Sequence, residues 1–202
     1  MALWLGRDPL VLASRSAARR ALLDAAGIPV AAHPADLDER RLEERASISA
    51  PGAVALMLAR EKAAAVASLH LGRLVLGADQ TLAFGERRFA KPGDRAAARA
   101  QLLALRGRSH ELHAAIAIAR DATILFEHVA VARLTMRHFS ERFLDLYLDA
   151  AGAAATASVG AYQIEGLGIQ LFERIEGDYF TVLGLPLLAA LDYLRQSGCL
   201  AP

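Results

Sequence analysis

Asp79 is the residue whose position most clearly suggests chemistry. It ends the apolar run Leu74–Ala78, which predicts a buried strand, and open α/β sheets bind their ligands where strands end. A carboxylate at that place can hold a divalent metal or take a proton from water. Gly77 just before it allows another group to approach the backbone closely. An ordinary polar end to a strand accounts for the same residues equally well.

Two serines and two arginines follow an earlier apolar run. Ser14 and Ser16 can each cap the helix expected to begin at residue 17, and Arg19 and Arg20 lie in its first turns. A helix N-terminus beside arginines is an anion site, and the commonest anion there is phosphate. The simpler interpretation is a capped helix with two solvated arginines.

Three more polar residues suit a phosphate or a metal, and each has a plain alternative. Lys91 precedes a Pro-Gly turn that would fix its charge in place, but most such lysines are only solvated. Lys62 lies on an expected helix beside Glu61, where an intrahelical ion pair would contribute little. Glu39 lies in an acidic stretch that could reach a metal or form a surface loop.

The segment 160–168 has three glycines around the polar residues Gln163 and Glu165. Strand-like alternation would place these two side chains on one side of the segment. The glycines indicate that backbone lies close to a planar or phosphorylated ligand. The six histidines show no metal-ligand spacing.

Composition excludes several classes of protein. Of 202 residues, 54% are hydrophobic and 22% charged, which is typical of a globular domain rather than a disordered chain. A net charge of +1 argues against a nucleic-acid coat. The single cysteine, Cys199, cannot form an internal disulfide, and the first nine residues lack a signal-peptide core. No apolar run is long enough to span a bilayer. We therefore expect a cytoplasmic protein with no membrane or nucleic-acid partner.

The pattern of elements predicts a mixed α/β fold in one domain, residues 1–202, with two lobes and a groove between them. The expected strands cover 10–13, 74–78, 111–119, 124–135 and 167–173, and residues 28–30 lead into a further short strand. A hairpin turn is expected over 84–89 and a connection over 120–122. The expected helices cover 17–26, 51–69, 94–105, 140–149 and 185–197, with an acidic loop over 36–40.

Taken in order, these motifs resemble the Maf family of nucleotide pyrophosphatases. The resemblance spans nearly the whole chain. It rests on Leu12–Ser16 with Arg19–Leu23, Glu61–Ala63, Gly77–Gln80, Lys91–Pro92, Gly160–Gly168, Ile175–Tyr179 and Gly184–Pro186.

The resemblance implies a Maf/ITPase-like fold, an elongated mixed sheet flanked by helices with a cleft between two lobes. It implies hydrolysis of a nucleoside triphosphate between the α and β phosphates, with Mg²⁺ or Mn²⁺. Asp79 would act as general base and, with Glu39, hold the metal; nearby cations would lower the pKa of Asp79. The substrate would contact Ser14, Arg19, Arg20, Lys62, Gln80, Lys91 and Glu165.

Two features resemble the branch of the family that acts on 7-methyl-GTP. The double arginine stands at Arg19–Arg20, and Glu165 replaces a glutamine typical of the dTTP/UTP branch. A carboxylate can accept hydrogen bonds from the N1–H and N2–H₂ edge of guanine. Ala18, however, stands where the 7-methyl-GTP branch usually has a tryptophan that would stack on a cationic base.

Three alternatives stay open. The chain could be a dTTP/UTP pyrophosphatase, a regulatory protein of cell division and septum formation, or a nucleotide sensor without turnover. A homodimer is also left open.

Overall fold

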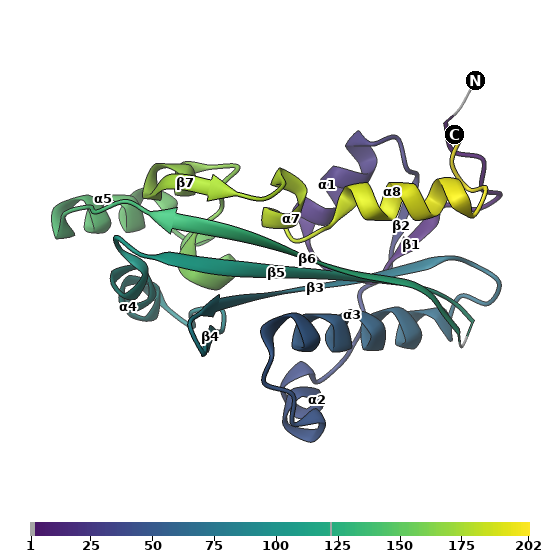
Figure 1. The fold of residues 1–202 in the computed structure, drawn as a ribbon, viewed down its shortest axis with the longest axis horizontal. Helices are drawn as coiled ribbons and strands as arrows, with labels where there is room; N and C mark the ends of the chain where they lie inside the picture. Colours follow the sequence, from purple (N-terminus) through teal and green to yellow (C-terminus); the bar gives the residue numbers. More distant parts are fainter. Residues whose placement is uncertain (1–2, 122) are drawn as a thin grey trace. The chain divides into compact units, whose positions relative to one another are not determined.

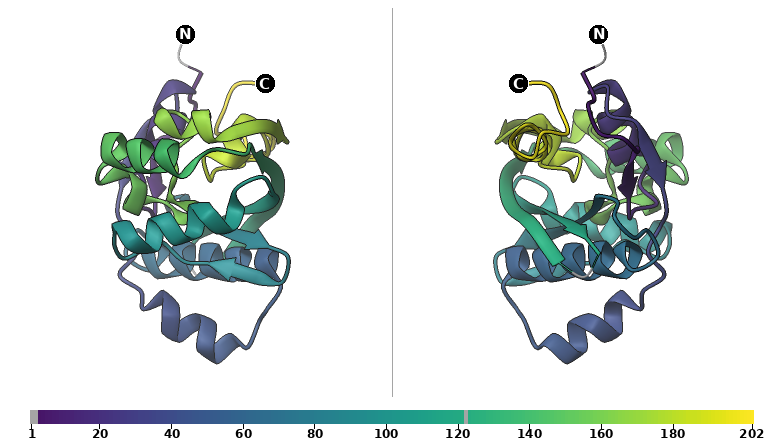
Figure 2. Two further views of the ribbon diagram at one scale, coloured as in Figure 1. Left: turned by 90° about the vertical axis from the view of Figure 1, so that its left-hand side faces the viewer. Right: turned by 90° about the vertical axis from the view of Figure 1, so that its right-hand side faces the viewer.

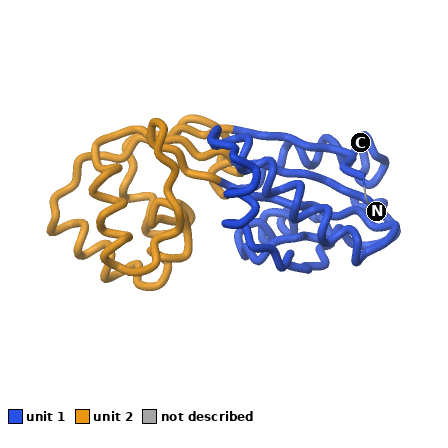
Figure 3. The backbone as a smooth tube through the Cα atoms, turned by 90° about the horizontal axis from the view of Figure 1, so that it is seen from below, with its two compact units in different colours: residues 1–80, 114–130, 184–202 blue, residues 81–113, 131–183 orange. Residues whose placement is uncertain are grey.

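The computed structural model describes residues 3–121 and 123–202, and it divides into two compact units (Figure 3). Unit 1 contains residues up to 80, 114–130 and from 184 onward. Unit 2 contains 81–113 and 131–183. Three strands contribute residues to both units. The expected single domain stays a prediction.

A mixed sheet forms the centre of the fold (Figure 1). Strand β1 pairs in parallel with β2 and β3, whereas β4 is antiparallel to β3 and β7 is antiparallel to β6. The order is β2-β1-β3-β5-β6-β7, with β4 beside β3. The predicted mixed α/β class is therefore confirmed. The strands are β1 (Leu10–Leu12), β2 (Val30–Ala32), β3 (Val75–Phe84), β4 (Arg87–Phe89), β5 (Ser109–Arg120), β6 (Thr123–Met136) and β7 (Phe172–Glu176).

The five predicted helices are present, and polar caps begin three of them. Ser16, Asp94 and Ser140 each accept a hydrogen bond from the backbone N–H three residues later. The helices are α1 (Ala17–Ala25), α2 (Glu39–Ala46), α3 (Pro51–Ala67), α4 (Arg95–Leu105), α5 (Glu141–Ala151), α6 (Ala154–Ala157), α7 (Tyr179–Val182) and α8 (Leu187–Gln196), with the 3-10 helices η1 (Val159–Ala161) and η2 (Leu167–Leu171).

In unit 1, α3 lies along β3 at very short range. Ala55, Ala59 and Ala63 recur every four residues on one face of the helix and are fully buried. Ala59 and Ala63 face the strand at Gly77, where an added Cβ would come 2.1 Å from the carbonyl oxygen of Ala59. Helix α8 covers the opposite side of this part of the sheet (Figures 1 and 2). Small residues on both partners therefore set the distance between α3 and β3.

Unit 2 has its own apolar core, packed around α4 and α5. It includes Leu102 from α4, Leu134 from β6 and Leu144 from α5, all fully buried. Two buried polar groups lie within it: the His110 ring and the Tyr162 hydroxyl share a hydrogen bond of 2.8 Å.

The structure corrects three predicted elements. Strand β3 continues five residues past Asp79, so this residue lies inside a strand of the central sheet and not at its end. The acidic loop gives way at Glu39 to helix α2, capped by Asp38; charged residues on every side hid the apolar periodicity that marks a helix. The strand predicted over 167–173 is η2 followed by β7.

Two further points concern the edges of strands. The short strand expected to follow residues 28–30 is β2, which begins at Val30 and pairs in parallel with β1 from Leu10 onward. The predicted connection 120–122 includes residue 122, which lies outside the described residues, while β5 runs to Arg120 and β6 begins at Thr123.

Candidate active site

A buried lysine joins two carboxylates in unit 1. The Nζ atom of Lys62 lies 2.5 Å from Oδ1 of Asp79 and 2.9 Å from Oε1 of Glu39. Lys62 and Asp79 are 9% and 8% exposed, so water screens their interaction weakly. Glu61, the neighbour expected as a surface partner, is exposed. The structure thus gives Lys62 two acidic partners from elsewhere in the chain.

The α3–β3 contact explains why this pair forms. Asp79 lies two residues after Gly77, and alternation puts both on the face of β3 that meets α3. Lys62 lies beside Ala63, whose backbone nitrogen an added Cβ on Gly77 would approach to 2.6 Å. The sequence left open which group approaches the backbone at Gly77, and in the structure this group is helix α3 of the same chain.

Burial raises the pKa of the Asp79 carboxyl above its ordinary value, because removing water penalises the charged form. The positive charges of Lys62 and Arg19 act in the opposite direction and do not outweigh burial. The expected lowering of this pKa is therefore wrong. A raised pKa makes the carboxylate a stronger base.

The guanidinium of Arg19 holds three segments of unit 1 together. Its Nε donates to the carbonyl oxygen of Gly184 at 2.8 Å, and its Nη1 donates to that of Ala78 at 2.8 Å. The same Nη1 lies 3.2 Å from the hydroxyl oxygen of Ser14. Burial lowers the pKa of Arg19, opposed by the charges of Asp79 and Glu39. Arg19 thus fixes the backbone next to Asp79 and adds positive charge beside it.

Gln80 and Gly184 lie side by side next to this guanidinium. A Cβ on Gly184 would come 3.2 Å from Nη2 of Arg19 and 3.4 Å from Oε1 of Gln80. Gly184 also has a φ of +85°, which L side chains rarely adopt. The Gly-Leu-Pro motif at 184–186 was expected only as part of the family resemblance, and its place beside the site was not predicted. Gly184, with Pro186 two residues later, was the available signal.

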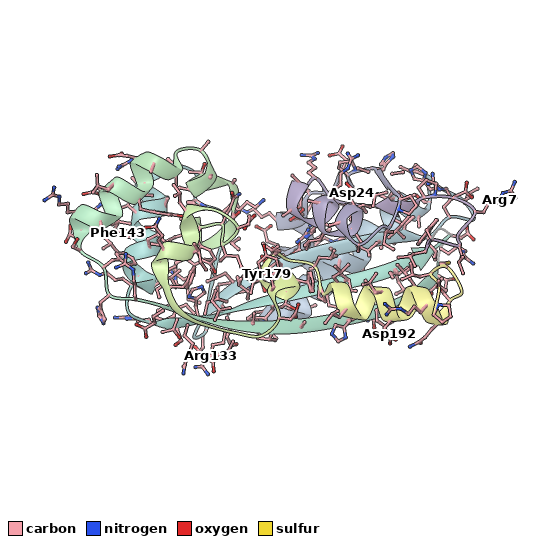
Figure 4. All side chains as sticks on the ribbon, turned by 90° about the horizontal axis from the view of Figure 1, so that it is seen from above. Arg7, Asp24, Arg133, Phe143, Tyr179 and Asp192 are labelled. Carbon is pink, nitrogen blue, oxygen red and sulfur yellow. The ribbon has the colours of Figure 1, made fainter. Side chains whose placement is uncertain are left out.

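Arg20 lies outside this cluster. Its side chain is exposed and pairs with Asp24 at 3.5 Å, one helical turn away on α1, where Figure 4 labels Asp24. An exposed i,i+4 pair of this kind contributes little to stability. The structure therefore gives Arg20 a surface partner and does not bring it to Asp79.

The two remaining predicted residues belong to unit 2. Lys91 is exposed in the loop between β4 and α4. Glu165 is exposed in a turn between η1 and η2. The side-by-side placement of Gln163 and Glu165 assumed an extended strand, and that assumption is wrong because the segment is a turn.

Glu39 and Asp79 are the acidic groups that a metal could use. Both reach the same ammonium nitrogen, so their oxygens converge on one position that a cation occupies. Within residues 3–121 and 123–202, no group of three or more His, Cys, Asp or Glu side chains could hold a metal. Mg²⁺ commonly binds through one or two carboxylates and completes its shell with water and substrate phosphates. The Lys62 ammonium already lies between the two carboxylates, so a magnesium or manganese ion at this place stays a prediction.

Comparison with known proteins decides the family. The model of the Maf-like protein family matches residues 9–197. The chain belongs to the Maf family. A Maf relative described as a nucleoside triphosphate pyrophosphatase, from Rhodopseudomonas palustris (strain ATCC BAA-98 / CGA009), is 59% identical over 100% of both chains. Another, described as a 7-methyl-GTP pyrophosphatase, from Mesorhizobium japonicum, is 51% identical over 96% of this chain and 98% of its own.

Among solved structures, a HAM1 protein from Coxiella burnetii is 19% identical, with a TM-score of 0.41 over 63% of this chain and 72% of its own. None of the helices in the described part of this Maf chain is long and apolar enough to cross a membrane.

Proposed function

We propose that this Maf chain is a nucleoside triphosphate pyrophosphatase that hydrolyses 7-methyl-GTP or a related modified nucleotide to the monophosphate and pyrophosphate. The observation that carries the proposal is the buried pair of Asp79 and Lys62, with the exposed Glu39 in contact with Lys62 and the partly buried Arg19 beside the pair. Burying a carboxylate and an ammonium is costly, and such groups are often kept because a function requires them. A triphosphate is a ligand whose binding and hydrolysis need positively charged groups and a carboxylate in one place.

Asp79 acts as the general base in this proposal. Its carboxylate takes a proton from a water molecule while the water oxygen forms a new bond to the phosphorus of the α phosphate. The bond between the α and β phosphates breaks, and pyrophosphate leaves with the bridging oxygen. Burial supports this role, because it raises the pKa of Asp79 toward the range in which a carboxylate accepts protons well.

The cations stabilise the negative charge of the phosphates. Lys62 offers a buried ammonium, and Ser14 places a hydroxyl before the N-terminus of α1. Lys91 adds an exposed ammonium from unit 2. Arg19 holds Ser14 and the backbone beside Asp79, so its contribution is positioning together with charge.

A divalent cation, Mg²⁺ or Mn²⁺, would be held by Glu39 and Asp79. When bound, it would offset charge on the phosphate oxygens. Lys62 occupies the position between the two carboxylates and keeps them close together.

Glu165 is proposed to select the base. An exposed carboxylate can accept two hydrogen bonds from the N1–H and N2–H₂ edge of a guanine, an edge that pyrimidines lack. The Mesorhizobium relative described as a 7-methyl-GTP pyrophosphatase supports the choice of substrate. Ala18 provides no aromatic face, which leaves the dTTP/UTP assignment as the competing outcome.

The general base is tested by Asp79→Asn with Mg²⁺ or Mn²⁺. We expect pyrophosphate release to fall at least about 100-fold while nucleotide binding persists, because the amide cannot take the proton. Asp24→Asn changes an exposed carboxylate of the same unit and should retain full activity. Unchanged turnover by Asp79→Asn would show that another group activates water.

Base selection is tested by pyrophosphate release from 7-methyl-GTP, GTP, CTP, dTTP and UTP. The native chain should prefer 7-methyl-GTP, and Glu165→Gln should weaken that preference about tenfold because it loses one acceptor. Glu173→Gln, an exposed change in the same unit, is the matched control. A native preference for dTTP or UTP would overturn the substrate assignment and leave the Asp79 assignment intact.

The expected location in the cytoplasm and the homodimer stay predictions. Cell fractionation and light scattering of the purified chain measure them directly.

A further inference from the structure

One side chain of unit 2 connects the two loops that carry Lys91 and Glu165. Gln101, on α4, donates from Nε2 to the carbonyl oxygen of Ala90 at 2.8 Å. Its Oε1 accepts a hydrogen bond from the backbone N–H of Gly160 at 3.2 Å. A carbonyl only accepts and a backbone N–H only donates, so the two partners fix the orientation of the amide.

The Gly160 end of this connection is a strained turn. Gly160 and Ala161 both have positive φ, +79° and +63°, and both are buried. A non-glycine residue in this region costs about 1–2 kcal/mol and persists only where its surroundings hold it. The Tyr147 hydroxyl donates to the carbonyl oxygen of Ala161 at 3.0 Å, and Gln101 binds the preceding residue. These two side chains therefore hold the conformation of the turn.

The turn at Gly160 and Ala161 sets the starting position of the segment that carries Glu165. After Ala161 the side chain of Tyr162 is buried, and the backbone then folds back on itself. The close approach is seen at Gly168, where an added Cβ would lie 2.5 Å from the carbonyl oxygen of Gln163. The backbone between 163 and 168 is thus closed on itself. A shift at Gly160 would move this closed turn, and Glu165 with it.

The Ala90 end lies where the chain leaves the core. Phe89 is buried, Ala90 is exposed, and Lys91 follows before Pro92 restricts the backbone. The hydrogen bond from Gln101 is the contact that fixes the Ala90 carbonyl. It therefore restrains the backbone from which the Lys91 side chain extends.

We propose that Gln101 is a positioning residue that couples phosphate binding by Lys91 to base selection by Glu165. The inference rests on the proposed function, because the roles of Lys91 and Glu165 belong to it. Gln101 itself need not touch the substrate. The amide nitrogen of Gln101 binds the loop before Lys91, and the amide oxygen binds the turn before Glu165. Substitution can therefore separate the effect on phosphate binding from the effect on base selection.

The test compares Gln101→Glu with Gln101→Ala on 7-methyl-GTP and UTP. A glutamate retains the acceptor for Gly160 but cannot donate to Ala90, so KM should rise about fivefold for both nucleotides with their kcat/KM ratio unchanged. An alanine loses both bonds, so the ratio between the two nucleotides should also fall about fivefold. In both variants kcat should change less than KM, because Asp79 is untouched.

Gln196→Ala is the matched control, since it removes a glutamine whose amide donates to Asp192 within α8. Thermal melting identifies a variant that fails to fold, and the glutamate variant then carries the test. The inference fails if Gln101→Ala keeps the native KM and nucleotide ratio. An inactive native chain would instead overturn the proposed function, and a native chain active with a different preference would overturn the base assignment alone.

Discussion

At the scale of single residues, the site depends on Lys62 more than sequence analysis could show. Its ammonium contacts Asp79 and Glu39 at once, and all three belong to unit 1. Removing one partner of a buried ion pair leaves an uncompensated charge, which costs more than the pair itself contributes. Lys62 therefore serves both stability and the charge state of Asp79.

We predict that Lys62→Met lowers kcat/KM at least about 100-fold, because Asp79 loses its nearest cation and the phosphates lose an ammonium. The free energy of unfolding should fall by about 3 kcal/mol. Steady-state kinetics and urea denaturation measure the two effects. Glu61→Gln, an exposed change one residue away, should leave both near the native values. Native activity in Lys62→Met would remove this residue from the site.

At the scale of elements, the site is produced by the packing of α3 on β3. The alanines of α3 and Gly77 of β3 let the two backbones approach until Lys62 reaches Asp79. The helix is weakly amphipathic by sequence, and its fit to the strand comes from side-chain size. A larger side chain at this contact would separate the elements and with them the ion pair.

We predict that Gly77→Ala destabilises the chain by about 2–3 kcal/mol and reduces activity with it, because the new methyl group overlaps the backbone of Ala59 and Ala63. Gly93→Ala, where an added Cβ meets no atom within 4 Å, should leave stability unchanged. Chemical denaturation of both variants gives the comparison. Equal stability of Gly77→Ala and the native chain would contradict the close contact.

At the scale of the whole molecule, the free energy of unfolding should depend on pH through a buried histidine. His110 is 2% exposed, and within the described residues its Nδ1 has no hydrogen-bond partner. Burial lowers the pKa of His110 from 6.5 to about 4. The unfolded chain therefore binds a proton at this residue as pH falls below 6.5, whereas the folded chain does not until about pH 4.

We predict that acidification from pH 7 to pH 4 removes about 3 kcal/mol of stability through His110, since each unit of pKa difference is worth about 1.4 kcal/mol. His110→Gln should flatten this part of the pH dependence. His128→Gln, which changes an exposed histidine, should leave the native profile. Denaturation at several pH values checks the prediction, and a native profile in His110→Gln would contradict it.

Much of the fold was predictable from local pattern. Apolar runs located most strands, and Ser16, Asp94 and Ser140 marked helix starts, because capping requires specific side chains at specific positions. Helix α2 was not predicted because it has no apolar stripe. The 3-10 helix η2 was predicted as a strand because its apolar and other residues alternate as they do in a strand. The continuation of β3 past Asp79 was missed because a carboxylate inside a strand needs a partner that the local sequence does not reveal.

The sequence by itself determined the α/β class, the Maf resemblance and the residue types that could bind a polyanion, since these follow from composition, periodicity and short motifs. The tertiary structure alone decided which residues meet. It brought Lys62 to Asp79 and Glu39, gave Arg19 the carbonyls of Ala78 and Gly184, and turned Arg20 to the surface. It also reversed the expected pKa shift of Asp79. Contacts and burial join residues far apart in the chain, and both arise only when helices and strands pack.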